Sequence, residues 1–183
     1  MDKYKNKYRI PSTRAYWHDY NDGMYFITIC TANREHFFGE IENGEMQYTA
    51  IGDYTRQIIE NTHTHNTYAA IMQYVLMPNH LHLIVMIDNT DGVMNDDTDG
   101  ACPVSTDRIN KKMQKISHRK GYLSVTIGNI KSAITKYATE NGIPFKWQPL
   151  FHDHIIRNQP EYDRIATYIE NNIKNWKEDK YKG

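Results

Sequence analysis

The apolar positions in the first half of the chain fall into short runs of strand length. Residues 24–31 are rich in aromatic and β-branched side chains, which is typical of a strand. Residues 68–77 and 80–87 form two further runs that meet at Pro78-Asn79. Because proline has no N–H to donate to a neighbouring strand, this dipeptide predicts a tight bend between two strands. A short strand is also expected at 46–49.

Three other segments space their apolar residues as helices do. Residues 54–62 predict one helix, and residues 124–141 predict a second that ends before Gly142. The last helix is expected to begin after Asn158, because Glu161 follows three residues later in the pattern of a capping box. Its apolar side comprises Ile165, Ile169, Ile173 and Trp176.

The order of these elements predicts the fold. With residues 147–156 as a fourth strand or extended segment, the chain reads strand, helix, strand, strand, helix, strand, and then a final helix. This βαββαβ order predicts an α+β, ferredoxin-like antiparallel sheet with helices on one face and an appended C-terminal helix. The other face would stay available to a ligand. Residues 88 to about 122 lack apolar periodicity and predict a flexible excursion within a single domain spanning 1–183.

Length and composition fit a globular domain without a membrane partner. The chain has 183 residues and a mean hydropathy of −0.75, and no apolar run approaches the ~18 residues of a membrane span. No secretory signal is recognisable at the start. Cys30 and Cys102 lack the spacing of a zinc site, and so small a number predicts no disulfide framework. A cytoplasmic location is therefore expected.

The formal net charge of zero hides local segregation. The first 14 residues are mainly basic, an acidic block lies within 88–107, and a basic block follows within 108–120. Local basic patches, not the total, determine the attraction of phosphates. The alternative interpretation is that these are solvated loop charges.

Two pairs of residues could carry chemistry. His80 and His82 are separated by one residue on a predicted strand, so both side chains point to the same face and make half of a metal site. Tyr168 and Asn172 are four residues apart and share a face of the last helix. Together they could hold Mg²⁺ or Mn²⁺ with open positions for phosphate, and place a tyrosine nucleophile beside it. Alternatively, all four are ordinary strand and helix residues.

The motifs around these residues resemble the single-tyrosine HUH transposases of the IS200/IS605 type, and most of all the REP-associated tyrosine transposases. The resemblance covers nearly the whole chain except 88–120. It rests on Tyr8–Ser12, Tyr25–Thr31, Asn33–Glu35, Met77–His82 (MPNHLH), Trp147-Gln148, Phe151–His154, Ile156–Asn158, Tyr168–Asn172 (YIENN) and Trp176.

The resemblance implies a metal-dependent DNA endonuclease and strand transferase. His80, His82 and Asn172 would bind a divalent cation, Mg²⁺ or Mn²⁺, and Tyr168 would be the catalytic nucleophile. The tyrosine would cut single-stranded DNA at a hairpin, stay joined to the 5′ phosphate and release a 3′ hydroxyl. That hydroxyl can reverse the reaction and rejoin strands, because the phosphotyrosine conserves the bond energy.

The partner is therefore expected to be single-stranded or hairpin DNA, with no membrane. The protein would be associated with the nucleoid when DNA is bound. Arg9, Lys131 and Arg157 are predicted to contact the DNA backbone. Both homodimers and monomers are compatible with the resemblance. Ile173 stands where the family commonly has proline, which predicts a longer last helix. Two alternatives stay open: a protein that binds structured DNA without cutting it, and a metal-dependent phosphodiesterase that activates water.

Overall fold

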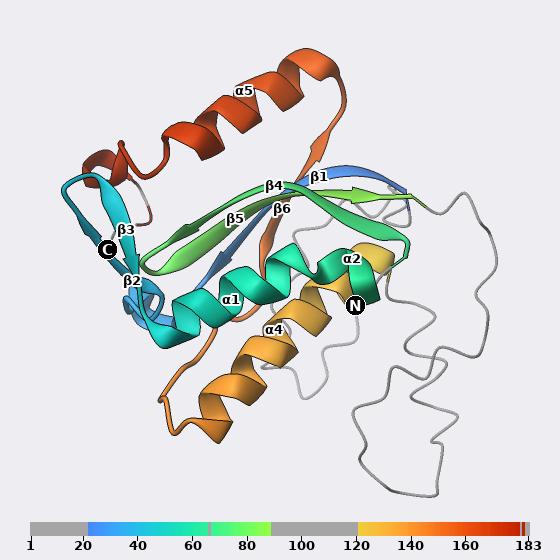
Figure 1. The fold of residues 1–183 in the computed structure, drawn as a ribbon. Helices are drawn as coiled ribbons and strands as arrows, with labels where there is room; N and C mark the ends of the chain where they lie inside the picture. The colour runs from blue at the N-terminus through green and yellow to red at the C-terminus, as the bar shows by residue number, and fades with distance from the viewer. Residues whose placement is uncertain (1–21, 66, 89–120, 180, 182–183) are drawn as a thin grey trace, which may run out of the picture.

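The structure, a computed structural model, describes residues 22–65, 67–88, 121–179 and 181 (Figure 1). Arg9 and the rest of the basic N-terminal arm lie outside the described residues. So does nearly all of the excursion predicted at about 88–122, including the basic block. Within the described part of the chain, no helix is long and apolar enough to cross a membrane.

A four-stranded sheet forms the centre of the fold. It comprises β1 (Gly23–Cys30), β4 (Ala69–Met77), β5 (His80–Ile87) and β6 (His152–Ile156) in the order β4-β5-β1-β6. All neighbouring pairs are antiparallel. Since β1 lies between the third and fourth strands of the βαββαβ unit, the predicted α+β, ferredoxin-like arrangement is confirmed.

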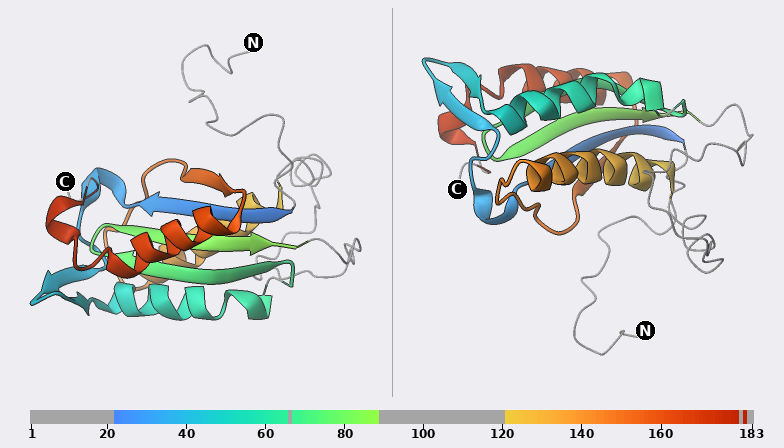
Figure 2. Two further views of the ribbon diagram at one scale, coloured as in Figure 1. Left: turned by 90° about the horizontal axis from the view of Figure 1, so that it is seen from above. Right: turned by 60° about the horizontal axis from the view of Figure 1, so that its bottom comes forward.

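The helices lie on both faces of this sheet. Helices α1 (Ala50–Glu60) and α4 (Tyr122–Glu140), with the short α2 (Thr62–His65), cover one face. Helix α5 (Gln159–Asn171) crosses the opposite face, as the two views of Figure 2 show. The appended helix therefore covers the face that was predicted to stay available to a ligand.

Alternation along the strands divides the side chains between the two faces. On β5, Leu81, Leu83 and Val85 join the apolar core beneath α1 and α4. His80 and His82 point to the other face, as period-two alternation requires. The tight connection from β4 to β5 through Pro78-Asn79 is also confirmed.

A hairpin before α1 was only partly predicted. It pairs β2 (Gly39–Glu42) with β3 (Glu45–Tyr48), of which only the second strand was expected. Helix α1 begins at Ala50, four residues earlier than predicted, because the Thr49 hydroxyl accepts a hydrogen bond from the Gly52 N–H at 3.2 Å. A side chain at Gly52 would collide with the Phe38 carbonyl oxygen, so close packing of hairpin and helix requires glycine there.

The ends of the later elements confirm some predictions and correct others. Gly142 follows α4 with φ of 66°, as expected of a residue just past a helix end. Of the segment predicted at 147–156, only the last five residues form β6. Helix α5 starts after the Asn158 cap, but it ends at Asn171, so the prediction of a longer helix was wrong. The chain turns instead into a short 3-10 helix η3 (Trp176–Glu178), which buries the Trp176 ring in the apolar cluster beneath α5.

Candidate active site

The two histidines of β5 lie side by side on the face that α5 covers. Both are buried, and their ring centroids are 4.7 Å apart. The His82 Nδ1 lies 2.9 Å from the Thr28 hydroxyl on β1, and the His80 Nδ1 lies 2.8 Å from the Asn79 Oδ1. A hydrogen bond at the Nδ1 fixes the orientation of each imidazole and leaves its Nε2 to bind a metal ion.

Asn79 fixes which nitrogen of His80 carries the proton. Its side-chain Nδ2 donates to two backbone carbonyls, those of Arg34 at 3.1 Å and Tyr181 at 2.9 Å. The Asn79 Oδ1 is therefore the atom that faces His80, and it can only accept a hydrogen bond. The His80 Nδ1 must be the donor, so in the neutral ring the Nε2 carries the lone pair.

Tyr168 reaches this pair from the opposite side of the cleft. Its hydroxyl lies 3.2 Å from the His82 Nε2, and its ring packs edge-on to Phe26 at 6.0 Å between centroids. The Tyr168 side chain is 39% exposed, whereas Ile165 and Ile169 on the same helix are buried against the sheet. The two isoleucines hold the helix, and the phenol remains open to the cleft.

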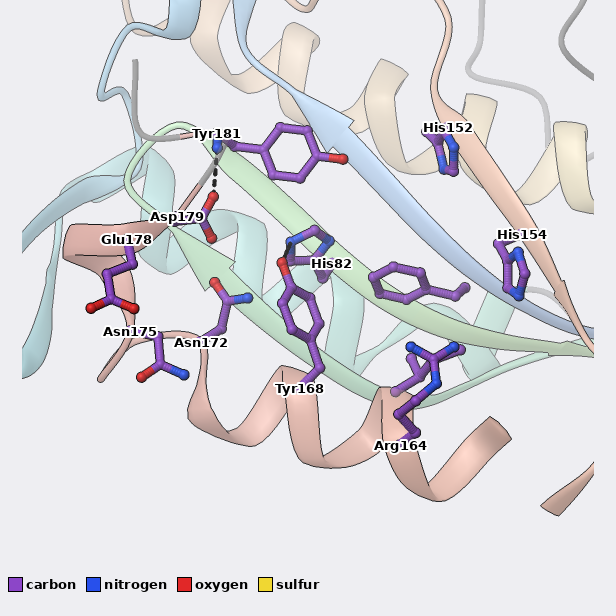
Figure 3. Close-up of a pocket in the computed structure, with 12 residues that line it drawn as sticks. His82, His152, His154, Arg164, Tyr168, Asn172, Asn175, Glu178, Asp179 and Tyr181 are labelled. Atoms are coloured by element: carbon purple, nitrogen blue, oxygen red, sulfur yellow. Dashed lines mark hydrogen bonds between the residues drawn. The ribbon is translucent and has the colours of Figure 1, made fainter. Parts of the chain in front are cut away.

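Asn172, one turn after Tyr168, carries a polar atom that needs a partner. The residue is only 2% exposed, yet its Oδ1 accepts no hydrogen bond from any residue that the structure describes. A buried polar atom in that condition is costly, and it is normally satisfied by water or an ion. Figure 3 shows this side chain between Tyr168 and Asp179.

Asp179 completes a group that could hold a metal ion. Ligand atoms of His80, His82 and Asp179 all lie within 4.8 Å of one another. The Asp179 Oδ2 is 3.8 Å from the His80 Nε2, and the Tyr181 N–H donates to the Oδ1 at 2.6 Å. Asp179 was not among the residues predicted from the sequence. Its only signal was a carboxylate soon after Trp176, and the expected long helix would not have pointed it at the histidines.

One cleft of about 710 Å³ between α5 and the sheet is lined by His82, Tyr168, Asn172 and Asp179, whereas His80 is fully buried beside His82. Figure 3 shows Tyr168 in the middle of the cleft. Glu178 and Asp179 lie at one end, and His152, His154 and Arg164 lie at the other. The structure thus brings together His80, His82, Tyr168 and Asn172, which the sequence analysis had singled out, and adds Asp179.

Neither Arg157 nor Lys131, two of the residues predicted to contact DNA, lines the cleft. Arg157 is exposed in the turn before α5. Lys131 lies on α4, across the sheet from the cleft, where its ammonium donates to the carbonyls of Gln148 and Leu150 at 3.3 and 3.1 Å. Burial lowers the pKa of the Lys131 ammonium. DNA contacts by either side chain stay predictions, and Arg9 is outside the described residues.

Comparison with known proteins adds a relative and a fold. An uncharacterized protein of Haemophilus influenzae is 36% identical over 165 residues, which are 87% of this chain and 84% of that protein. The structure of a REP-associated tyrosine transposase bound to a REP hairpin is similar over 89% of this chain and 72% of that one, with a TM-score of 0.50 and 20% identity. A crystal structure from Deinococcus radiodurans R1 is more distant, with a TM-score of 0.38, 14% identity, and coverage of 88% and 97%. No protein-family model matches the chain.

Proposed function

We propose that this chain cleaves and rejoins single-stranded DNA at hairpins. The chain belongs to the same family as the Haemophilus influenzae protein. It has the fold of a REP-associated tyrosine transposase. The observation that carries the proposal is the Tyr168 hydroxyl, 3.2 Å from the His82 Nε2 at the edge of a His-His-Asp group. The related transposase was solved with a REP hairpin, and we infer a similar DNA partner for this chain.

In the proposed reaction the Tyr168 oxygen attacks a phosphorus atom of the DNA backbone. A bond forms between the tyrosine oxygen and phosphorus, and the bond from phosphorus to the 3′ oxygen breaks. The phenolic proton passes to solvent, to which Tyr168 is open, and the departing 3′ oxygen takes up a proton. Attack by the 3′ hydroxyl reverses these steps and rejoins a strand without an external energy source.

The residues present fit a divalent cation. Two imidazoles, a carboxylate and an amide oxygen are ligands that Mg²⁺ and Mn²⁺ accept. We propose His80, His82, Asp179 and Asn172 as these ligands, since the Asn172 Oδ1 is buried without a hydrogen-bond partner among the described residues. A bound cation would polarise the phosphate and favour the ionised tyrosine.

We further propose that Tyr168 serves the histidines of its own chain. The apolar residues Ile165 and Ile169 pack α5 against the same sheet that carries His80 and His82. The Gln73 side chain of β4 also donates to the Ala166 carbonyl of α5 at 3.3 Å. This placement supports strand cleavage by a monomer, with dimerisation left unnecessary for the first cut.

The test is a covalent adduct between protein and DNA. Hairpin repeats that flank the gene, labelled at the 3′ end, are incubated with protein and Mn²⁺ and separated in denaturing gels. We expect a labelled band at the mass of protein plus DNA, lost in Tyr168→Phe and kept in the matched control Tyr162→Phe on the same helix.

The two alternatives give different results. A protein that only binds DNA would shift the hairpin in native gels but yield neither cut DNA nor adduct. A phosphodiesterase that activates water would cut DNA without an adduct and would retain activity in Tyr168→Phe. Either result would overturn the proposed nucleophile.

A further inference from the structure

The end of the cleft beyond Tyr168 carries positive and titratable side chains that the proposed chemistry does not use. His152 and His154 come from β6, and Arg164 comes from α5 (Figure 3). At the opposite end, Asp179 and Glu178 are acidic. A DNA strand along the cleft would therefore meet a cation site at one end and a basic group at the other.

The spacing along α5 matches a strand that runs beside it. Arg164, Tyr168 and Asn172 are four residues apart in sequence, and all three line the cleft. Four residues of helix rise by about 6 Å, so the three side chains form a row with steps of that size. This step is on the scale of one nucleotide of an extended strand. A phosphate attacked by Tyr168 would have its neighbour close to Arg164.

Glu161 holds residues at the basic end of the cleft in place but does not itself line the cleft. Its carboxylate accepts from the Arg157 N–H at 2.9 Å and pairs with the His154 Nε2 at 2.7 Å. These two contacts hold the pKa of Glu161 below its ordinary value, which keeps it ionised. Arg164 lies 3.9 Å from the same carboxylate, too far for a hydrogen bond, and its side chain is 70% exposed.

We infer that Arg164 binds the DNA phosphate adjacent to the one that Tyr168 attacks. His154, which is held by its contact with Glu161, lies at the same end of the cleft. The inference rests on the proposed function, since it requires a single strand to lie in the cleft. A guanidinium suits this role, because it offers several donors in a plane to the oxygens of a phosphate. Arg164 would thereby align the strand, and it would not take part in bond breaking.

Binding tests this assignment without any cleavage. Fluorescein-labelled oligo(dT) of 20 nucleotides is titrated with protein in EDTA, and its anisotropy is followed at several salt concentrations. We expect Arg164→Gln to weaken binding several-fold. The slope of the logarithm of the association constant against the logarithm of the salt concentration should become less negative by about 0.7, because one phosphate contact on a single strand is lost. Arg56→Gln on α1, across the sheet, is the matched control and should leave the slope unchanged.

A second measurement identifies the phosphate. Adduct formation is compared on hairpins in which a neutral methylphosphonate replaces one phosphate next to the cleavage site, on either side. At the correct position the substitution should slow the wild type and abolish the difference between wild type and Arg164→Gln. Additive effects at both positions would overturn the inference.

Failure of this inference and failure of the proposed function are distinguishable. An unchanged salt slope in Arg164→Gln, with a normal adduct in the wild type, overturns the Arg164 subsite alone. A reduced slope in a protein that forms no adduct supports the subsite for a DNA-binding protein and overturns the proposed chemistry.

Discussion

The two faces of the central sheet differ in what they bury. The face beneath α1 and α4 is packed with apolar side chains, whereas the face beneath α5 combines a smaller apolar cluster with buried polar residues and an open cleft. Among the described residues, the buried polar side chains of the second face include Thr28, His80, His82 and Asn172. We therefore expect one face to supply most of the stability, while the other carries the residues of the proposed reaction.

Strand alternation lets the same strands serve both faces. On β5 the sequence HLHLIVMI places leucines on the face beneath α1 and α4, here called the dry face, and the two histidines on the α5 face. A shift of one residue in register would exchange these sets and bury histidines in the apolar core, so the pattern also fixes the register. Thr28 and Asn79 then provide the hydrogen bonds that buried imidazoles need.

The largest effect on stability is expected from a cavity on the dry face. Leu83→Ala should lower the free energy of unfolding by about 2–5 kcal/mol, because Leu83 is fully buried and its site cannot collapse completely. His82→Ala, the neighbour on the other face, should cost less stability but abolish the adduct. Urea denaturation and the adduct assay measure the two effects. Equal destabilisation by both variants would contradict the division of roles between the faces.

Binding of Mn²⁺ should stabilise the α5 face. At a concentration one hundred times its dissociation constant, a cation that binds only the folded protein adds about 2.7 kcal/mol, which thermal unfolding would report as a higher midpoint. Asp179→Asn should remove much of this gain, because Asp179 lies with the histidines. The neighbouring Glu178→Gln, outside that group, should retain it. Identical shifts in the two variants would exclude Asp179 as a ligand.

Matched substitutions at two helix caps, one on each side of the sheet, should differ in their effect on the reaction. The Asn158 side chain accepts the Glu161 N–H of α5, and the Thr49 hydroxyl accepts the Gly52 N–H of α1. Asn158→Ala and Thr49→Ala should each cost about 1 kcal/mol of stability. Only the first should also slow adduct formation, because α5 carries Tyr168. If Thr49→Ala slows the reaction equally at full folding, the dry face also tunes the site.

The smallest effect concerns acid stability at Glu161. Its pKa is lowered in the folded protein, first by the Arg157 N–H and then by His154. Its contribution is therefore fully present above the unfolded pKa of about 4.3 and is lost as the pH falls through the lower folded value. Thermal midpoints from pH 7 to 3 should converge for wild type and Glu161→Gln on the acid side. A difference that does not shrink as the pH falls would contradict the lowered pKa.

Local signals and the family resemblance predicted most of the fold and every residue of the candidate site named above except Asp179. The Pro78-Asn79 bend, the Asn158–Glu161 capping box and the alternation at His80 and His82 depend on neighbours in the sequence, so they could be recognised there. The early start of α1 depended on Thr49, whose capping role the apolar pattern does not reveal.

Asp179 could not be predicted for a different reason. Its place beside His80 depends on the end of α5 at Asn171 and on the burial of the Trp176 ring, which turns the chain back toward the sheet. This is a tertiary effect, and the apolar spacing through Trp176 favoured a continuous helix. The contacts of Lys131 could not be predicted from local spacing either, because the carbonyl groups that it binds belong to a different segment of the chain.

In the proposed reaction Tyr168 forms the bond to DNA, and mass spectrometry can identify the residue that carries the nucleotide. After reaction with hairpin DNA in Mn²⁺, the protein is treated with nuclease and trypsin, and the peptides are sequenced by fragmentation. We expect a nucleotide attached through its 5′ phosphate to Tyr168, and unmodified Tyr162 and Tyr181. Cleaved DNA with no modified tyrosine, or a nucleotide on another residue, would contradict it.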